Sequence, residues 1–322
     1  MKDRSMDRAA AGGEHGFSII EVMIAMVILM VVCGTVMQGV LALTDVSQTV
    51  SNRTDMHNGV RNATELLTQE VGQAGRISLP AAVTLAAPVV AGVGNLITVS
   101  SSDGMFVGEQ LLLGVDNQQE TVTVANINGQ VITLAGVPGY DHPAGAPVTA
   151  PGGFAAGVVP PNAANGSTAT RLKIFGDIHD DGTLVYVEYF CDQAAGRLYR
   201  NVMPITAGAK AAPGVEQILI DNIEVNPPDV NGNVPDCFTY QTRTVTGTTF
   251  VIDVAITLTV RSQQVDKNTG TFARETKALL NVAPRNVFNV WQMASLDIDN
   301  RVQPMPPSLL NLLPDQDAVE AQ

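Results

Sequence analysis

A single carboxylate, that of Glu21, lies near the start of the apolar run "FSIIEVMIAMVILMVV", which begins at Phe17. Membrane-spanning segments rarely contain a carboxylate, because hydrocarbon does not solvate a charge. The segment is therefore either not a membrane helix, or Glu21 has a function in it. Phe17 and Glu21 are four residues apart, so in a helix they share one face. A positive charge next to Glu21 would form an ion pair that a low dielectric strengthens.

A second group of carboxylates lies in "DIHDDGTLVYVE", residues 177–188. Asp177, Asp181 and Glu188 have the spacing of a twelve-residue calcium loop, with a glycine at the turn and a histidine at the third position. Histidine is a poor calcium ligand, and the strand-like sequence that follows would carry Glu188 away from the turn. We therefore favour an Asp-Gly hairpin turn between two strands. The alternative is a calcium ion held by Asp177, Asp180 or Asp181.

The cysteines suggest a different kind of chemistry. Cys33 lies inside the apolar run and should behave as a small hydrophobic residue. Cys191 and Cys237 lie in a region rich in β-like sequence. If that region is exported, we expect these two residues to form a disulfide.

The sequence contains no convincing catalytic set. No nucleophile motif or phosphate-binding loop is present. His57, His142 and His179 are isolated from one another in sequence. We therefore expect no enzymatic activity, and no cofactor apart from the calcium alternative.

Composition limits the class of partner. The chain has 322 residues, of which 45% are apolar and 15% charged, with a formal net charge of −13. This composition is typical of a globular body rather than a disordered chain. The negative charge argues against nucleic acid as the main partner, because phosphates must be neutralised by Lys or Arg.

The elements that position Glu21 begin with a long apolar segment, 17–43. At about 1.5 Å per residue, a helix over this segment is about 40 Å long, which is enough to span a bilayer. Lys2, Arg4 and Arg8 precede it. Because Lys and Arg orient a membrane segment more strongly than acids do, the N-terminus should stay in the cytoplasm and the rest of the chain should lie outside.

The helix should continue beyond the apolar segment. From Val46 to Ala74 most apolar residues recur three or four apart, which indicates an amphipathic stripe. Gly72 and Gly75 weaken the helix, and Pro80 should end it. We expect one helix of about 55 to 60 residues, whose second half needs a β-sheet to cover its stripe.

Gly16, Phe17 and Glu21, followed by the long apolar run, resemble the class III signal of type IV prepilins and related pseudopilins. The resemblance implies that prepilin peptidase cuts between Gly16 and Phe17, and that the new amine of Phe17 is N-methylated. It also implies that Glu21 serves assembly, with the amine of a neighbouring subunit as its counter-ion. Before assembly the protein would lie in the inner membrane with a single span and its body in the periplasm. It would lie in the pilus filament afterwards.

Sequences later in the chain resemble a narrower group. "DGTLVYVEYF", "RLYRNV", "VAITLTVR" and a strand ending at Pro284-Arg285-Asn286 are similar to PilW-like minor pilins and to J-type minor pseudopilins of type II secretion. The resemblance implies a minor pilin that helps to initiate and assemble a type IV pilus near its tip. Alternatives are a J-type pseudopilin and a pilus-tip adhesin. The implied partners are other minor and major pilins, prepilin peptidase and the inner-membrane assembly platform.

These observations together predict an α+β fold in which a long N-terminal helix, membrane-spanning in its first half, packs on an antiparallel β-sheet. The turn signals Asp103-Gly104 and Asn128-Gly129 indicate a small β-module inserted into this fold. The expected segments are a prepilin leader (1–16), a membrane and filament-core helix (17–43), its amphipathic continuation (44–80), an inserted β-module (81–150), a linker (151–170), a pilin-type β-sheet body (171–288) and a C-terminal tail (289–322).

Overall fold

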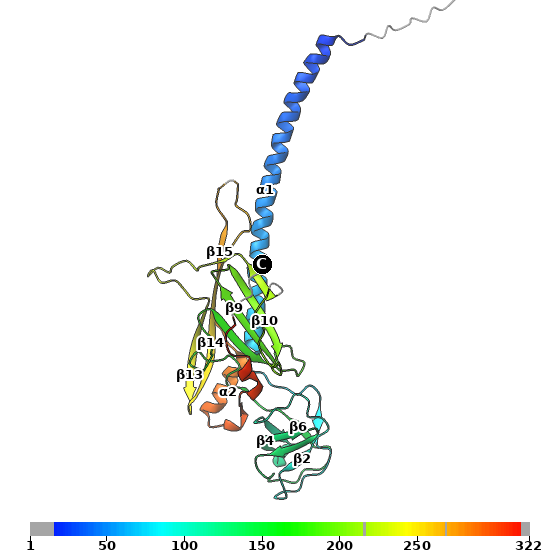
Figure 1. The fold of residues 1–322 in the computed structure, drawn as a ribbon, viewed down its shortest axis with the longest axis vertical. Coiled ribbons are helices and arrows are strands. Elements are labelled where there is room, and N and C mark those ends of the chain that lie inside the picture. The colour runs from blue at the N-terminus through cyan, green and yellow to red at the C-terminus, as the bar shows by residue number, and fades with distance from the viewer. Residues whose placement is uncertain (1–15, 215–216, 268, 317–322) are drawn as a thin grey trace, which may run out of the picture.

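The structure is a computed structural model that describes residues 16–214, 217–267 and 269–316. Nearly all of the expected leader and the last residues of the tail therefore lie outside the described residues. The molecule is elongated (Figure 1). One long helix projects from a β-rich body, and a small β-module lies at the opposite end of the molecule.

Helix α1 (Ile19–Gln73) has 55 residues. Its second half is amphipathic as predicted, because Val60, Ala63, Leu67 and Val71 follow a spacing of three and four and are all buried. The helix ends at Gln73, before the end expected at Pro80. The reason is Gly75, which has a φ of 80° and turns the chain away from the helix axis.

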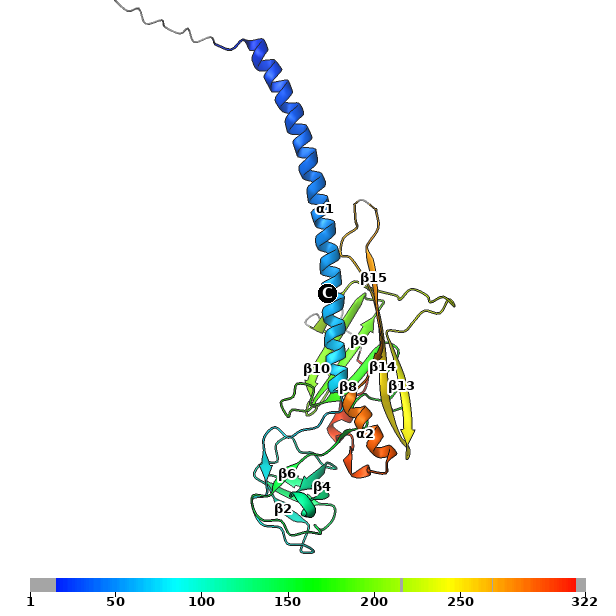
Figure 2. The same ribbon diagram turned by 180° about the vertical axis from the view of Figure 1, so that it is seen from behind.

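The β-body consists of antiparallel strands that curl around the second half of α1 (Figures 1 and 2). One sheet has the order β11-β10-β9-β8; in the other, β14 pairs with β12 and β13 and also with β15. Their bounds are β8 (Arg171–Gly176), β9 (Val185–Asp192), β10 (Arg197–Pro204), β11 (Ile218–Asp221), β12 (Ile223–Glu224), β13 (Phe238–Val245), β14 (Thr248–Arg261) and β15 (Arg274–Val282).

One hydrophobic core joins the helix to both sheets. Leu67 of α1 belongs to the same buried cluster as Leu172 and Val187 of one sheet and Leu258 of the other. The apolar stripe of the helix is thus covered by β-structure on the side where the sequence requires cover. The predicted fold class, a long N-terminal helix on an antiparallel sheet, is confirmed.

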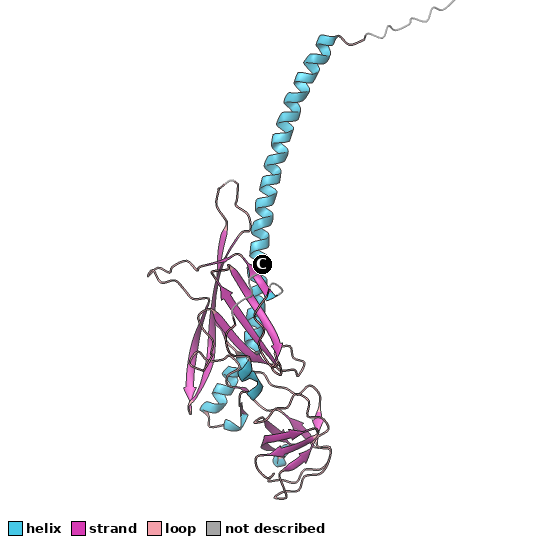
Figure 3. Ribbon diagram, viewed as in Figure 1, coloured by secondary structure: helices cyan, strands magenta, loops and turns pink. Residues whose placement is uncertain are grey.

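The inserted β-module is a six-stranded antiparallel sheet with its own core (Figure 3). Glycines 104 and 129 have positive φ angles, as the two turn signals require. The strand order is β1-β6-β3-β4-β5-β2. The bounds are β1 (Val83–Thr84), β2 (Leu96–Thr98), β3 (Gln110–Leu113), β4 (Glu120–Asn128), β5 (Val131–Leu134) and β6 (Pro147–Thr149), with the short helix η1 (Asp116–Gln118) before β4.

Residues 151–170, predicted to be a linker, are instead a packed part of the fold. Strand β7 (Gly153–Phe154) pairs in parallel with β16 (Val302–Gln303), and Gly153 also forms a bridge with Arg76. Phe154 and Val158 are fully buried. The glycines of this segment allow backbones to approach closely, since a Cβ on Gly157 would collide with Gly75. Glycine content here reflects close packing rather than flexibility.

The C-terminal segment also packs on the body. The final strand, expected to end at Pro284-Arg285-Asn286, instead ends at Val282. Helix α2 (Arg285–Ser295) begins three residues later. The short helices η3 (Asp299–Arg301) and η4 (Pro307–Asn311) follow. Leu309, Leu312 and Leu313 are buried in one cluster with Phe175 and Tyr186. The described part of the tail therefore contacts its own domain.

Candidate functional site

The N-terminal end of α1 presents the residues of the sequence motif to solvent. Ser18 is the N-cap of the helix, and Glu21 lies in its first turn. A carboxylate in this position interacts favourably with the positive end of the helix dipole. Gly16 and Phe17 precede the helix, and Phe17 is 81% exposed. The bond between Gly16 and Phe17 therefore lies in non-helical, accessible chain.

The first half of α1 does not pack against the core of the protein. Every residue from Phe17 to Thr44 is exposed, although nearly all of them are apolar. In the part of the chain that the structure describes, this is the one helix long and apolar enough to cross a membrane. An apolar surface of this size requires cover by lipid or by other apolar helices.

Comparison with known proteins bears on the same segment. Residues 12–37 match the family described as the prokaryotic N-terminal methylation motif. This match supports a type IV pilin-like protein. Neither a curated protein nor a solved structure matched the chain. In a pilin-like protein, the motif and the exposed apolar helix fit a prepilin signal, N-methylation and a transmembrane helix, and they are consistent with membrane anchoring before pilus assembly.

The two cysteines of the body form a disulfide in the structure. Cys191 is in β9 and Cys237 directly precedes β13, with their Cα atoms 6.5 Å apart. Both residues are buried. The bond links the two sheets at the point where the amide of Phe238 donates to the carbonyl of Ala169, just before β8. Cys33 is a free thiol on the exposed half of α1.

The carboxylates proposed as calcium ligands lie in the turn between β8 and β9. Asp177 is buried, accepts a hydrogen bond from the Ser78 hydroxyl, and also accepts one from the amide of Asp181 at 3.0 Å. Asp180 forms an ion pair with Arg76. Glu188 lies within β9 rather than in the turn and is paired with Arg171 at 2.7 Å. The loop is thus a turn whose carboxylates bind Arg76 and Ser78, and they fasten the segment that follows α1 to the sheet.

No metal cluster is present among the described residues, in the sense of three or more His, Cys, Asp or Glu side chains that converge on one point. His57, His142 and His179 lie in separate places. His57 pairs with Glu275, and His142 lies 2.9 Å from Glu120 inside the β-module. Burial would raise the pKa of the Glu120 carboxyl, but hydrogen bonds from the amides of Gly139 and Tyr140 and from His142 hold it below its ordinary value.

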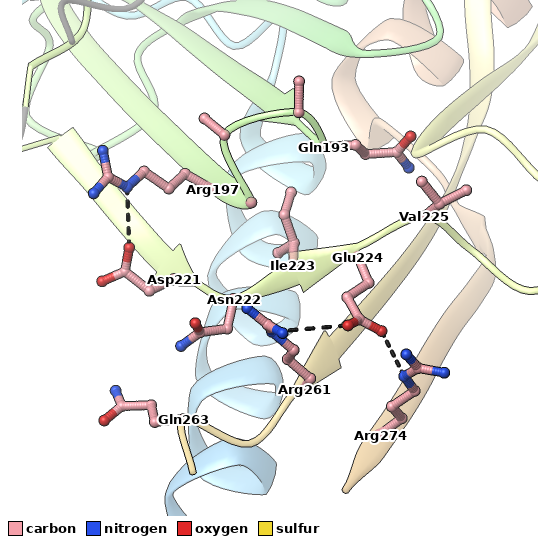
Figure 4. A pocket seen from close by; sticks show the side chains of 13 residues that line it. Gln193, Arg197, Asp221, Asn222, Ile223, Glu224, Val225, Arg261, Gln263 and Arg274 are labelled. Atoms are coloured by element: carbon pink, nitrogen blue, oxygen red, sulfur yellow. Dashed lines mark hydrogen bonds and ion pairs between the residues drawn. The ribbon is translucent and has the colours of Figure 1, made fainter. Parts of the chain in front are cut away.

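A polar groove that the sequence did not indicate lies where the chain passes from β11 to β12 (Figure 4). Its volume is about 890 Å³. Arg197 pairs with Asp221 at 3.3 Å, while Glu224 lies between Arg261 at 3.7 Å and Arg274 at 2.6 Å. These five residues come from five strands, so no sequence pattern brings them together. Each guanidinium faces a carboxylate, and the residues lining the groove include no His, Cys, Ser, Thr or Tyr that could act as a nucleophile or base.

Proposed function

We propose that the protein is a PilW-like minor pilin that helps to initiate and assemble a type IV pilus and stays near its tip. The observation that carries this proposal is the division of α1 into two halves. The first half is apolar and exposed, and the second half is fastened to a β-body by a common core. A helix built in this way can move from lipid into a bundle of equivalent helices while its body stays outside.

The proposed path of the protein follows from the motif. Prepilin peptidase would cut between Gly16 and Phe17 at the inner membrane, and the amine of Phe17 would be methylated. The body would then face the periplasm until the assembly platform moves the helix into the filament. There, the Glu21 carboxylate would pair with the Phe17 amine of a neighbouring pilin, since the low dielectric of a helix bundle favours that ion pair.

The position of the β-module supports a place near the tip. The module lies at the end of the molecule opposite to the N-terminal half of α1 (Figure 1). An additional folded unit at this end occupies space that a subunit stacked beyond this end would need. Such a unit is tolerated most easily where few or no subunits lie beyond it in the filament.

Deletion of the β-module tests this role. Strands β1 and β6 are paired, with Val83 opposite Val148, so the two ends of the module lie side by side and a short Gly-Ser linker can join residues 81 and 150. If the module serves assembly, cells with the deleted form should lose surface pili, whereas kept pili with lost adhesion would favour a tip adhesin. In a strain lacking the protein, pili should be lost and type II secretion kept. Lost secretion with normal pili would instead indicate a J-type pseudopilin.

A second candidate function, a tip adhesin, is favoured by one feature of the module. Val90, Val93, Val137 and Tyr140 are all exposed, on two loops that a hydrogen bond from the amide of Gly92 to the carbonyl of Pro138 joins. Neighbouring exposed apolar side chains are typical of binding surfaces. Replacing Val90, Val93 and Tyr140 by Ser should then reduce adhesion at unchanged piliation, whereas equal adhesion would count against this function.

A further inference from the structure

The turn between β14 and β15 extends beyond the rest of the body and runs along α1 toward its apolar half (Figures 1 and 2). We call residues 262–273, apart from 268, the β14–β15 turn. Two ion pairs fasten it to the helix. Lys267 Nζ lies 2.5 Å from Asp45 Oδ1, and Arg53 Nη2 lies 2.9 Å from Asp266 Oδ2. The turn is therefore held against one stretch of α1.

Hydrogen bonds inside the turn give it a defined shape. The amide of Asp266 donates to the carbonyl of Thr271 at 3.0 Å, and the amide of Gly270 donates to the carbonyl of Asp266 at 2.7 Å. Gly270 has a φ of 67°, which a tight turn of this kind requires. At the base of the turn, the Ser262 amide donates to the Ala273 carbonyl at 2.8 Å. The height of Lys267 along α1 is thus set by the fold.

Lys267 thus lies at the level of α1 where the apolar segment 17–43 ends. Asp45 is the first charged residue after Glu21. It follows Leu43 by two residues, which is about 3 Å along the helix axis. A bilayer has about 30 Å of hydrocarbon within a total thickness of about 40–45 Å, so an apolar helical segment of about 40 Å extends beyond the hydrocarbon and ends within the headgroup layer.

We propose that, while α1 is inserted in the membrane, the β14–β15 turn lies in the lipid headgroup layer and Lys267 contacts lipid phosphates. This inference rests on the membrane anchoring of α1 in the proposed function. The side chain of Lys267 is 64% exposed. Its ammonium group has three donors, of which Asp45 takes one. Val265, 43% exposed on the same turn, contributes an apolar side chain to the interfacial layer.

The contact gives the body a second attachment besides the helix. The chain as a whole carries a net charge of −13, so an anionic membrane surface repels most of the body. A lysine at headgroup height supplies a local attraction to phosphate, which falls off within a Debye length. The body would thereby be kept in one orientation on the membrane until the helix is withdrawn for assembly.

Fluorescence quenching in vesicles tests the proposal with the full chain. A Cys33→Ala background removes the free thiol, and the disulfide cysteines stay protected. Single cysteines are then introduced as Val265→Cys, Leu43→Cys and Val230→Cys and labelled with an environment-sensitive fluorophore. Leu43 reports membrane insertion. Val230 is the matched control, a fully exposed valine in the loop between β12 and β13.

The vesicles contain phosphatidylglycerol and phosphatidylethanolamine, with a fraction of the lipids bearing a nitroxide on the headgroup. We expect the label at 265 to lose fluorescence to nearly the same extent as the label at 43, while the label at 230 stays bright. If 43 is quenched and 265 behaves like 230, the turn is away from the membrane and the inference is wrong, although insertion holds. If 43 is not quenched, the membrane anchoring fails and the inference fails with it.

The lysine contact has its own test. Lys267→Gln in the 265-labelled chain should reduce quenching toward the level at 230, and should do so more in vesicles rich in phosphatidylglycerol than in phosphatidylcholine alone. Lys277→Gln, an exposed lysine on β15 farther from the turn, is the control and should change nothing. Equal quenching with and without Lys267 would overturn the phosphate contact.

Discussion

Glu70 of α1 and Arg200 of β10 form an ion pair beneath the helix. Glu70 is only 4% exposed, and Nε of Arg200 lies 3.2 Å from each of its carboxylate oxygens. Arg200 Nη2 also donates to this carboxylate, and so does the hydroxyl of Tyr189. Burial would lower the pKa of Arg200, but its hydrogen bond and charge interaction with Glu70 outweigh this effect and raise that pKa. One acid thus fastens the buried face of α1 to two strands.

Replacing Glu70 should loosen this attachment. Glu70→Ala leaves a partly buried guanidinium and a buried phenol without their acceptor, so we expect the free energy of unfolding to fall by about 3 kcal/mol. Denaturant unfolding of the full chain in detergent measures this loss. Glu65→Ala is the control, because Glu65 is exposed and solvent screens its ion pair with Arg61, so the free energy of unfolding should change much less. Equal effects of the two changes would contradict the role of Glu70.

The disulfide between Cys191 and Cys237 should contribute to the stability of the β-body. The two cysteines are 46 residues apart in sequence, so the bond restricts a long loop in the unfolded chain. Reduction should lower the free energy of unfolding by about 2–4 kcal/mol. Thermal unfolding with and without reductant measures this difference. Peptide mapping of the exported protein without reductant is the direct check, and two free thiols would contradict the pairing.

Much of the fold could be predicted from patterns that depend on neighbours in sequence. The spacing of Val60, Ala63, Leu67 and Val71 predicts a helix with one covered face, and the structure shows that face buried. The signal at Gly16, Phe17 and Glu21 is equally local. Such features can be predicted from sequence because helix periodicity and a peptidase signal each depend on residues that are close together in the chain.

Features that depend on tertiary contact could not be predicted in the same way. Residues 151–170 have the composition of a linker, but Gly157 packs against Gly75 and Phe154 fills a core. The end of α1 is set by Gly75, whose neighbours include Phe154 and Gly157 of that same segment. Composition does not distinguish a flexible glycine from one that permits close packing.

Buried polar groups show the same limit. Lys173 is fully buried, and its ammonium donates to the carbonyl of Leu313 at 2.7 Å and lies 2.5 Å from a carboxylate oxygen of Asp315. This contact fixes the described part of the tail on β8. In sequence, Lys173 is one polar residue of an alternating strand, for which an exposed position is the ordinary expectation. Its partner is 142 residues away.

Glu109, in the β-module, should make stability depend on pH. Its side chain is buried, one oxygen accepts from the amide of Phe106 at 3.1 Å, and the other oxygen has no partner among the described residues. Burial raises its pKa from 4.5 to about 8, and the hydrogen bond from Phe106 opposes this shift only in part.

The direction of the pH effect follows from proton binding. Between pH 4.5 and about 8 the unfolded chain has lost this proton while the folded chain keeps it, so stability falls as pH rises through that window. At about 1.4 kcal/mol per pH unit, the loss reaches several kcal/mol. Glu109→Gln should remove this contribution and raise the melting temperature at pH 8 more than at pH 5. Parallel pH profiles for the two proteins would show that Glu109 does not titrate in this way.

Glu21→Val should separate membrane insertion from filament assembly. Valine makes the apolar segment more hydrophobic, so the chain should still insert and should still be cut between Gly16 and Phe17, which the mass of its N-terminal peptide shows. The neighbour's Phe17 amine would then enter the helix bundle without a counter-ion, which is unfavourable in a low dielectric. We expect the variant in the membrane fraction and not in sheared filaments. Gln38→Leu removes a polar group from the same exposed segment without removing a charge and should assemble normally. Normal incorporation of Glu21→Val would mean that helix packing alone selects the register of the subunits.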